Sequence, residues 1–66
     1  MTTEEILLEA LKFYEIKVIS VNGNRVKVQN NFEIEVEAGH LYKLFNDGDV
    51  VAPFDDIDEL CWFILE

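Results

Sequence analysis

The sequence predicts a single small α+β domain, in which an antiparallel sheet of four or five strands carries an N-terminal and a C-terminal helix on one face. Apolar residues recur at helical spacing at both ends of the chain, whereas the middle consists of short segments in which apolar and polar residues alternate. Asn-Gly and Asp-Gly pairs, which favour tight hairpin turns, separate some of these segments. With 66 residues the chain has room for one domain, so we expect the order αβββββα over residues 1–66.

The first helix is expected over residues 3–14. Thr2 followed by Glu5 matches a capping box, in which each side chain accepts a hydrogen bond from the backbone of the other residue. At about 100° per residue a broad apolar stripe should face the sheet, while Leu8 falls outside that stripe. The predicted stripe consists of Ile6, Leu7, Ala10, Leu11, Phe13 and Tyr14.

Five short strands are expected in the middle of the chain. Asn22-Gly23 predicts a two-residue hairpin loop between the first two strands, because both turn positions need positive φ. This loop would pair Ile19 with Val26. The expected strands are residues 16–21, 25–29, 32–37, 41–45 and 50–54.

Charge decides the predicted register between the second and third strands. A two-residue loop at the paired asparagines would place Glu33 opposite Val28 and bury its carboxylate. A three-residue loop, with one asparagine in the left-handed conformation, instead places Lys27 across from Glu33. It also places Arg25 across from Glu35, so both cross-strand pairs are favourable and we predict the three-residue loop.

The last third of the chain predicts a second hairpin followed by a helix. Gly39 is expected to interrupt the regular structure after the third strand, and the second hairpin is expected to turn at Asp47-Gly48. Pro53 indicates an edge strand, because proline has no N–H to donate to a neighbouring strand. Asp55 is expected to cap the final helix, with further acids crowded into its first turn. The predicted buried stripe of this helix consists of Ile57, Leu60, Cys61, Ile64 and Leu65.

The charge balance limits the classes of partner. Fourteen Asp and Glu residues against five Lys and Arg residues give a formal net charge of −9. A surface this negative repels phosphate backbones and anionic membranes, so we expect neither direct nucleic-acid binding nor membrane binding. A single cysteine, and an N-terminus without the basic and apolar regions of a signal peptide, favour a cytoplasmic protein.

Few residues could carry chemistry, and we expect neither an enzyme nor a cofactor or metal site. His40 is the single histidine, and a lone loop histidine beside a potential turn is normally solvated rather than catalytic. Cys61 falls on the buried stripe of the last helix, where a thiol in apolar surroundings is inert. The acids at positions 55–59 lack the ligand spacing of a calcium loop, and helix capping explains them.

The last helix carries more apolar residues than one buried face can hold. Trp62 and Phe63 lie outside its stripe, so we predict an interface made by these two residues together with Leu8. The sequence leaves open the alternative that Trp62 packs on the first helix and Phe63 on the sheet margin. Glu59 and Glu66 would form an acidic rim, and Glu66 lies at the negative end of the helix dipole, where a partner's cationic group would be favourable.

Two functions are compatible with these features. The first is a small acidic protein-interaction module, a homodimer or a binder of another protein, that uses the aromatic C-terminal helix. The alternative is an acidic inhibitor or DNA-mimic decoy, encoded by a bacterium, a phage or another mobile element, that occupies a basic site on a nucleic-acid-binding protein. Salt separates the two, because the affinity of a decoy falls steeply with ionic strength and that of an aromatic interface does not.

Overall fold

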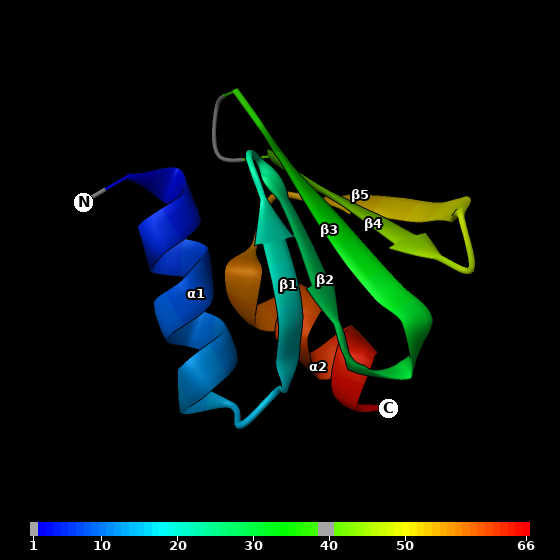
Figure 1. Cartoon of the computed structure of the whole chain (residues 1–66), viewed down its shortest axis with the longest axis horizontal. Helices are drawn as coiled ribbons and strands as arrows, with labels where there is room; N and C mark the ends of the chain where they lie inside the picture. Colours follow the sequence, from blue (N-terminus) through cyan, green and yellow to red (C-terminus); the bar gives the residue numbers. More distant parts are fainter. Residues whose placement is uncertain (1, 39–40) are drawn as a thin grey trace.

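The computed structural model describes residues 2–38 and 41–66, and within them the chain forms two helices and five strands (Figure 1). The strands form one antiparallel sheet in the order β1-β2-β3-β4-β5, so each strand lies beside its neighbour in the sequence. This arrangement confirms the predicted αβββββα order. The elements are α1 (Thr3–Phe13), β1 (Val18–Asn22), β2 (Arg25–Val28), the 3-10 turn η1 (Gln29–Asn31), β3 (Phe32–Glu37), β4 (Leu41–Asn46), β5 (Asp49–Phe54) and α2 (Ile57–Leu65).

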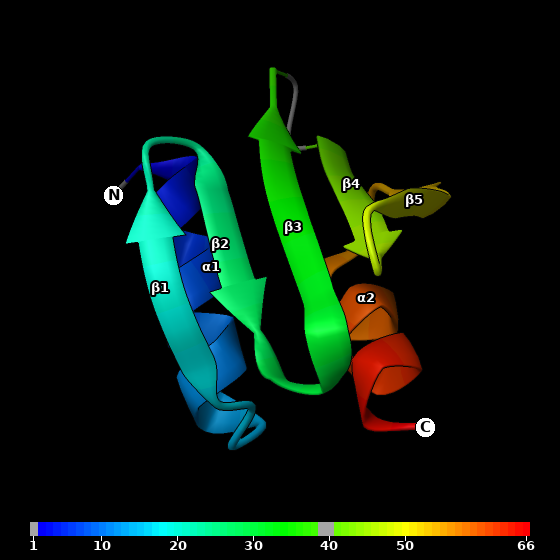
Figure 2. The same cartoon turned by 45° about the vertical axis from the view of Figure 1, so that its right-hand side comes forward.

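Both helices lie behind the sheet when it is seen from its open face (Figure 2). The core fills the space between the helices and the sheet, because alternate residues of the strands point toward the helices. The open face of the sheet carries the charged residues of the same strands. The buried core consists of Leu7, Leu11, Ile16, Val26, Val28, Ile34, Val36, Tyr42, Leu44, Leu60, Cys61 and Ile64.

The capping box at the start of α1 forms as predicted. The Thr2 hydroxyl oxygen accepts a hydrogen bond from the Glu5 backbone N–H at 3.2 Å, and the Glu5 carboxylate accepts one from the Thr2 N–H at 3.0 Å. These hydrogen bonds, above all that from the Thr2 backbone, lower the pKa of Glu5. The helix ends before Tyr14, and Glu15 has a φ of 58°, which turns the chain toward β1.

The predicted register of the first hairpin is wrong. Val26 pairs with Val21 rather than with Ile19, and the two-residue loop consists of Gly23 and Asn24. With glycine at the first loop position, the turn needs positive φ only there, and Gly23 has a φ of 63°. A bulge between Val18 and Ser20 then shifts Ile19 out of register, and its side chain is 58 % exposed.

The charge-matched register between β2 and β3 is confirmed. Lys27 lies opposite Glu33, and Arg25 lies opposite Glu35. The connecting turn is three residues long, and its two asparagines have φ values of 61° and 64°. These asparagines therefore accept the left-handed conformation that the loop requires.

The second hairpin also turns where predicted, at Asp47-Gly48, and both residues have positive φ. β5 forms a sheet edge, as Pro53 indicated. The cap of α2 is Asp56 rather than Asp55, because Asp56 has the extended backbone from which its carboxylate reaches the N–H groups of Asp58 at 2.8 Å and Glu59 at 3.3 Å. Asp55 lies one residue before the cap.

Candidate functional site

The side of α1 that faces the core differs from the predicted stripe. Leu7 and Leu11 are fully buried and mark the centre of the contact, whereas Ile6 is 37 % and Phe13 is 79 % exposed. At 100° per residue, Ile6 and Phe13 lie about 120° to 140° away from that centre. The predicted stripe was too broad, because a helix on a sheet buries only the residues nearest the contact line. Two members of the predicted stripe therefore lie on the outside of the molecule.

Leu8 is partly buried and packs against the core. It lies about 80° from the centre of the contact, on the side opposite Ala10, so its predicted place outside the stripe is wrong. The helix is rotated relative to the predicted orientation. As a result Leu8 contributes to the interior, and the surface of α1 is formed by other residues.

Of the two aromatic residues predicted for the α2 surface, Phe63 contacts two aromatic residues of the sheet, although 38 % of it remains exposed. The ring of Phe63 lies 6.2 Å from that of Phe32 and 5.7 Å from that of Phe54, centroid to centroid. This is the sheet-margin packing that the sequence left open as an alternative. Trp62 is 56 % exposed, and Leu65, predicted to be buried, is 47 % exposed in the last turn of the helix.

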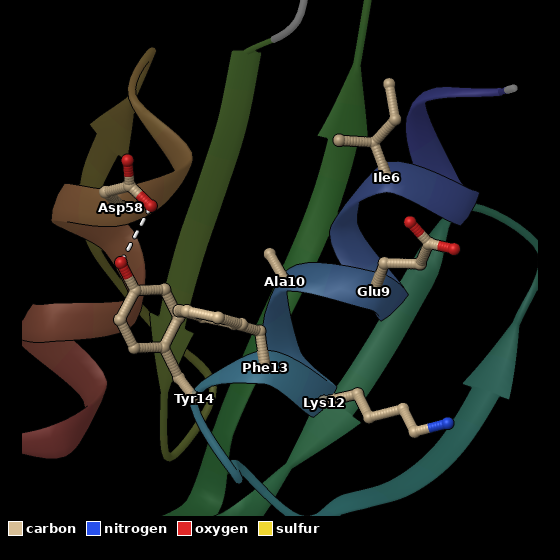
Figure 3. Close-up of a pocket in the computed structure, with 7 residues that line it drawn as sticks. All are labelled: Ile6, Glu9, Ala10, Lys12, Phe13, Tyr14 and Asp58. Atoms are coloured by element: carbon tan, nitrogen blue, oxygen red, sulfur yellow. Dashed lines mark hydrogen bonds between the residues drawn. The ribbon is translucent and has the colours of Figure 1, made fainter.

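A groove of about 690 Å³ runs beside α1 on the outer surface of the two helices. Ile6, Ala10 and Phe13 lie along it on successive turns of α1 (Figure 3). Ala10 is the small residue between the two large ones. Tyr14 and Asp58 close the side nearest α2.

Tyr14 joins the two helices at this site. Its hydroxyl donates a hydrogen bond to the Asp58 carboxylate at 2.8 Å, and its ring contacts that of Phe13 edge to face, with centroids 5.1 Å apart. The hydrogen bond to Asp58 is the main cause that raises the pKa of Tyr14 above its ordinary value. The hydrogen bond from Tyr14 to Asp58 thereby connects the two helices.

Carboxylates lie on both sides of the apolar strip. Glu9 projects from α1 and Asp58 from α2, and both residues are exposed (Figure 3). Among the described residues, Lys12 is the one cation that lines the groove, and its side chain extends away from Tyr14. Glu59 and Glu66, the acids predicted for a rim, are exposed at the two ends of α2. The groove is thus an apolar strip with acids at its borders.

Cys61, one of the two residues considered for catalysis, is not among the residues that line the groove. Cys61 is buried as predicted, and burial, with a smaller effect of Asp58, raises the pKa of its thiol to about 11. Within residues 2–38 and 41–66, no group of three or more metal-ligating side chains comes together. His40 and Gly39 lie outside the described residues. Neither described helix has the length and apolar character needed to cross a membrane.

The groove was not predicted from the sequence. Its lining residues Ile6, Ala10, Phe13 and Tyr14 were assigned to the core, and Asp58 to the first turn of the last helix. A signal was present in the run Leu7-Leu8 followed by Leu11, which centres the apolar side of the helix on the leucines and leaves Phe13 outside. Comparison of the chain with models of protein families, with curated proteins and with solved structures found no match. Function is therefore inferred from the surface itself.

Proposed function

We propose that the protein is a small acidic protein-interaction module whose contact surface is the outer side of its two helices. We call this surface the helical face. The observation that carries the proposal is the exposure of large apolar side chains on both helices, with Ile6 and Phe13 of α1 lining a groove and Trp62 exposed on α2. The helical face consists of Ile6, Ala10, Phe13, Tyr14, Trp62 and Leu65, bordered by Glu9, Asp58, Glu59 and Glu66.

The exposure of two aromatic residues supports the assignment. Phe13 is 79 % and Trp62 is 56 % exposed, although single-domain proteins usually cover large aromatic side chains at least in part. Burying such a side chain is worth about 1.5–3 kcal/mol, so contact with a partner would recover free energy that folding leaves unused. Aromatic residues in the centre of an interface are the usual sites of strong binding contributions. Phe13 and Trp62 are thus the expected anchors.

The other predicted interface residues take different roles. Leu8 and Phe63 pack against the core and the sheet margin, so we assign them to the support of the helices. Glu59 and Glu66 remain candidates for the acidic rim, which would steer a partner with basic residues around its apolar contact. We also propose that the protein acts in the cytoplasm, where a single reduced cysteine is the ordinary state.

The proposal is tested by the mass of the protein in solution and by two variants. Light scattering at two salt concentrations separates a dimer, of twice 7.7 kDa, from a monomer that awaits another protein. For a dimer, Trp62→Ala and Phe13→Ala should weaken self-association, whereas Ile19→Ala, which removes an exposed aliphatic residue from the sheet, should not. For a monomer, the same ranking of the three variants should hold for binding of its partner. If both helix variants associate as tightly as the Ile19→Ala control, the helical face is not the contact surface.

An acidic inhibitor or DNA-mimic decoy is the second candidate function. The net charge of −9 supports this function, but a decoy needs carboxylates that are free to take the place of phosphates. The three glutamates of β3 are paired with Arg25 and Lys43, which lowers the charge that they can offer. Binding that disappears between low and high salt, and that ignores Phe13→Ala, would favour the decoy over the interaction module.

A further inference from the structure

We infer that the groove accepts an amphipathic helix of a partner protein, with lysine or arginine on both sides of the helix's apolar stripe. The inference rests on the proposed function and specifies the chemistry of the partner. Three properties of the groove carry the inference: the shape of its floor, the helical structure of its walls and the negative charge at its borders. Each of them follows from residues along α1 and from Asp58 of α2.

The shape of the floor fits a helix. Ala10 lies between Ile6 and Phe13 on successive turns of α1, so a hole bordered by two large side chains opens over its methyl group. Helices pack by placing a side chain of one helix into such a hole of the other. From Ile6 to Phe13 the helix rises about 10 Å, or roughly two turns, which suits two or three apolar residues at helical spacing.

The nature of the walls excludes an extended peptide as the preferred occupant. α1 forms the floor of the groove and the wall on one side. Asp58, which closes the opposite side, belongs to α2. The backbone of a helix interior already forms its own hydrogen bonds, so these walls offer no ladder to an added strand. An extended segment in the groove would leave its backbone N–H and C=O groups without hydrogen-bond partners. A helix already satisfies these groups with its own internal hydrogen bonds.

The borders fit a cationic partner. Glu9 on α1 and Asp58 on α2 flank the apolar strip, and within the described part of the chain neither forms an ion pair. Lys12 also lines the groove, but its side chain extends away from Tyr14 and Asp58, so the groove keeps an excess of negative charge. A helix with basic residues on both sides of its apolar stripe would place them near these two carboxylates. A second copy of the chain would bring the same acids and a further net charge of −9, so charge favours a basic partner over self-association.

The experiment uses a synthetic peptide and the fluorescence of Trp62, the single tryptophan. The probe is a capped peptide of about 14 residues, four helical turns, made of leucine and lysine with leucines on one side. A control peptide carries glutamate at every lysine position. We expect the Leu/Lys peptide to shift the emission of Trp62 to shorter wavelength in a saturable manner and the Leu/Glu peptide to leave it unchanged.

A matched pair of variants separates the groove from general charge attraction. Phe13→Glu and Ile19→Glu each remove an exposed apolar side chain and add one negative charge, and neither position belongs to the buried core. Attraction by charge alone would tighten binding of the Leu/Lys peptide to both variants. If the groove is the site, Phe13→Glu should weaken binding roughly tenfold or more, as expected for an anchor residue, while Ile19→Glu binds at least as well as the wild type. Circular dichroism confirms that both variants fold.

Each contrary result has a defined meaning. Equal binding of the peptide to the Phe13→Glu and Ile19→Glu variants overturns the inference, as does the absence of binding to the wild type. The proposed function survives both results if Trp62→Ala and Phe13→Ala still weaken association in solution, because that test does not involve the peptide. A dimer that Phe13→Glu converts to a monomer would show that a second copy occupies the groove, and would also overturn the inference.

Discussion

The open face of the sheet and the helical face differ in how far their aromatic residues are covered. On the open face of the sheet, Arg25 forms ion pairs with Glu33 at 2.9 Å and with Glu35 at 3.3 Å. Its guanidinium also lies 4.6 Å from the centre of the Phe45 ring, so a charged side chain covers the aromatic one. On the helical face, Phe13 and Trp62 have no comparable cover.

The two faces also differ in where their charges lie. The sheet face pairs its charges across strands, from Arg25 with β3 to Lys43 with Glu37 at 3.2 Å. The helical face places its acids at the borders and its aromatic residues between them. Aliphatic residues such as Ile19 and Val50 are exposed on the sheet as well, so the contrast concerns the aromatic residues. An aromatic ring that is already covered gains less free energy from contact with a partner than one that remains open. The following changes test this contrast.

The largest effect is expected where one residue supports the helical face from below. Leu11 is fully buried against the core, and Leu11→Ala should lower the free energy of unfolding by about 2–5 kcal/mol, because it removes buried methyl groups and leaves a cavity. Urea denaturation followed by circular dichroism measures the change. A loss below 1 kcal/mol would mean that α1 can collapse onto the sheet, and would weaken the case for a rigid groove.

The next largest effect separates stability from association. Trp62→Ala should weaken binding of a partner by about 2 kcal/mol, the range of an interface anchor. The free energy of unfolding should change by only about 0.5 kcal/mol, because more than half of the side chain is already exposed. Light scattering and urea denaturation of the same preparation give both quantities. A loss of stability as large as that of Leu11→Ala would place Trp62 in the core.

A smaller effect is expected on the sheet face. Arg25→Ala removes two ion pairs and the cover of Phe45, and the arginine side chain is 42 % exposed. Partly exposed ion pairs contribute at most about 1 kcal/mol, and less at high salt. Denaturation at low and high salt should therefore show a small loss that shrinks as salt is added. Association through the helical face should remain unchanged, and a change there would contradict the independence of the two surfaces.

The smallest effect concerns the link between the helices. Tyr14→Phe removes the hydrogen bond to Asp58 and should slightly lower the unfolding midpoint. Because the pKa of Tyr14 is raised in the folded state, the contribution is fully present below the ordinary tyrosine pKa near 10 and is lost as pH rises through the higher, folded value. The midpoints of wild type and variant should therefore differ at pH 8 and converge in strong alkali. A difference that persists there would assign the effect to packing.

Local chemistry explains which parts of the fold could be predicted. The capping box at Thr2 and Glu5 involves residues three apart, and the asparagine turn needs only its own backbone preferences. The register of β2 against β3 follows from charge pairs on adjacent strands. The register of the first hairpin was harder to predict, because Gly23 can occupy either of two turn positions and the bulge at Ile19 has no marker in the sequence.

The order of the elements, the caps and turns to within a residue or two, and the surplus of apolar residues follow from the sequence alone. Packing between the elements set which of those apolar residues stay exposed. The rotation of α1 about its own axis depends on the sheet and on α2, and it turned Phe13 outward and Leu8 inward. The groove exists because Ala10 of one helix and Asp58 of the other, 48 positions apart in the sequence, line the same surface. Helical periodicity defines the angles between residues of one helix, but only packing between elements selects the side that remains in solvent.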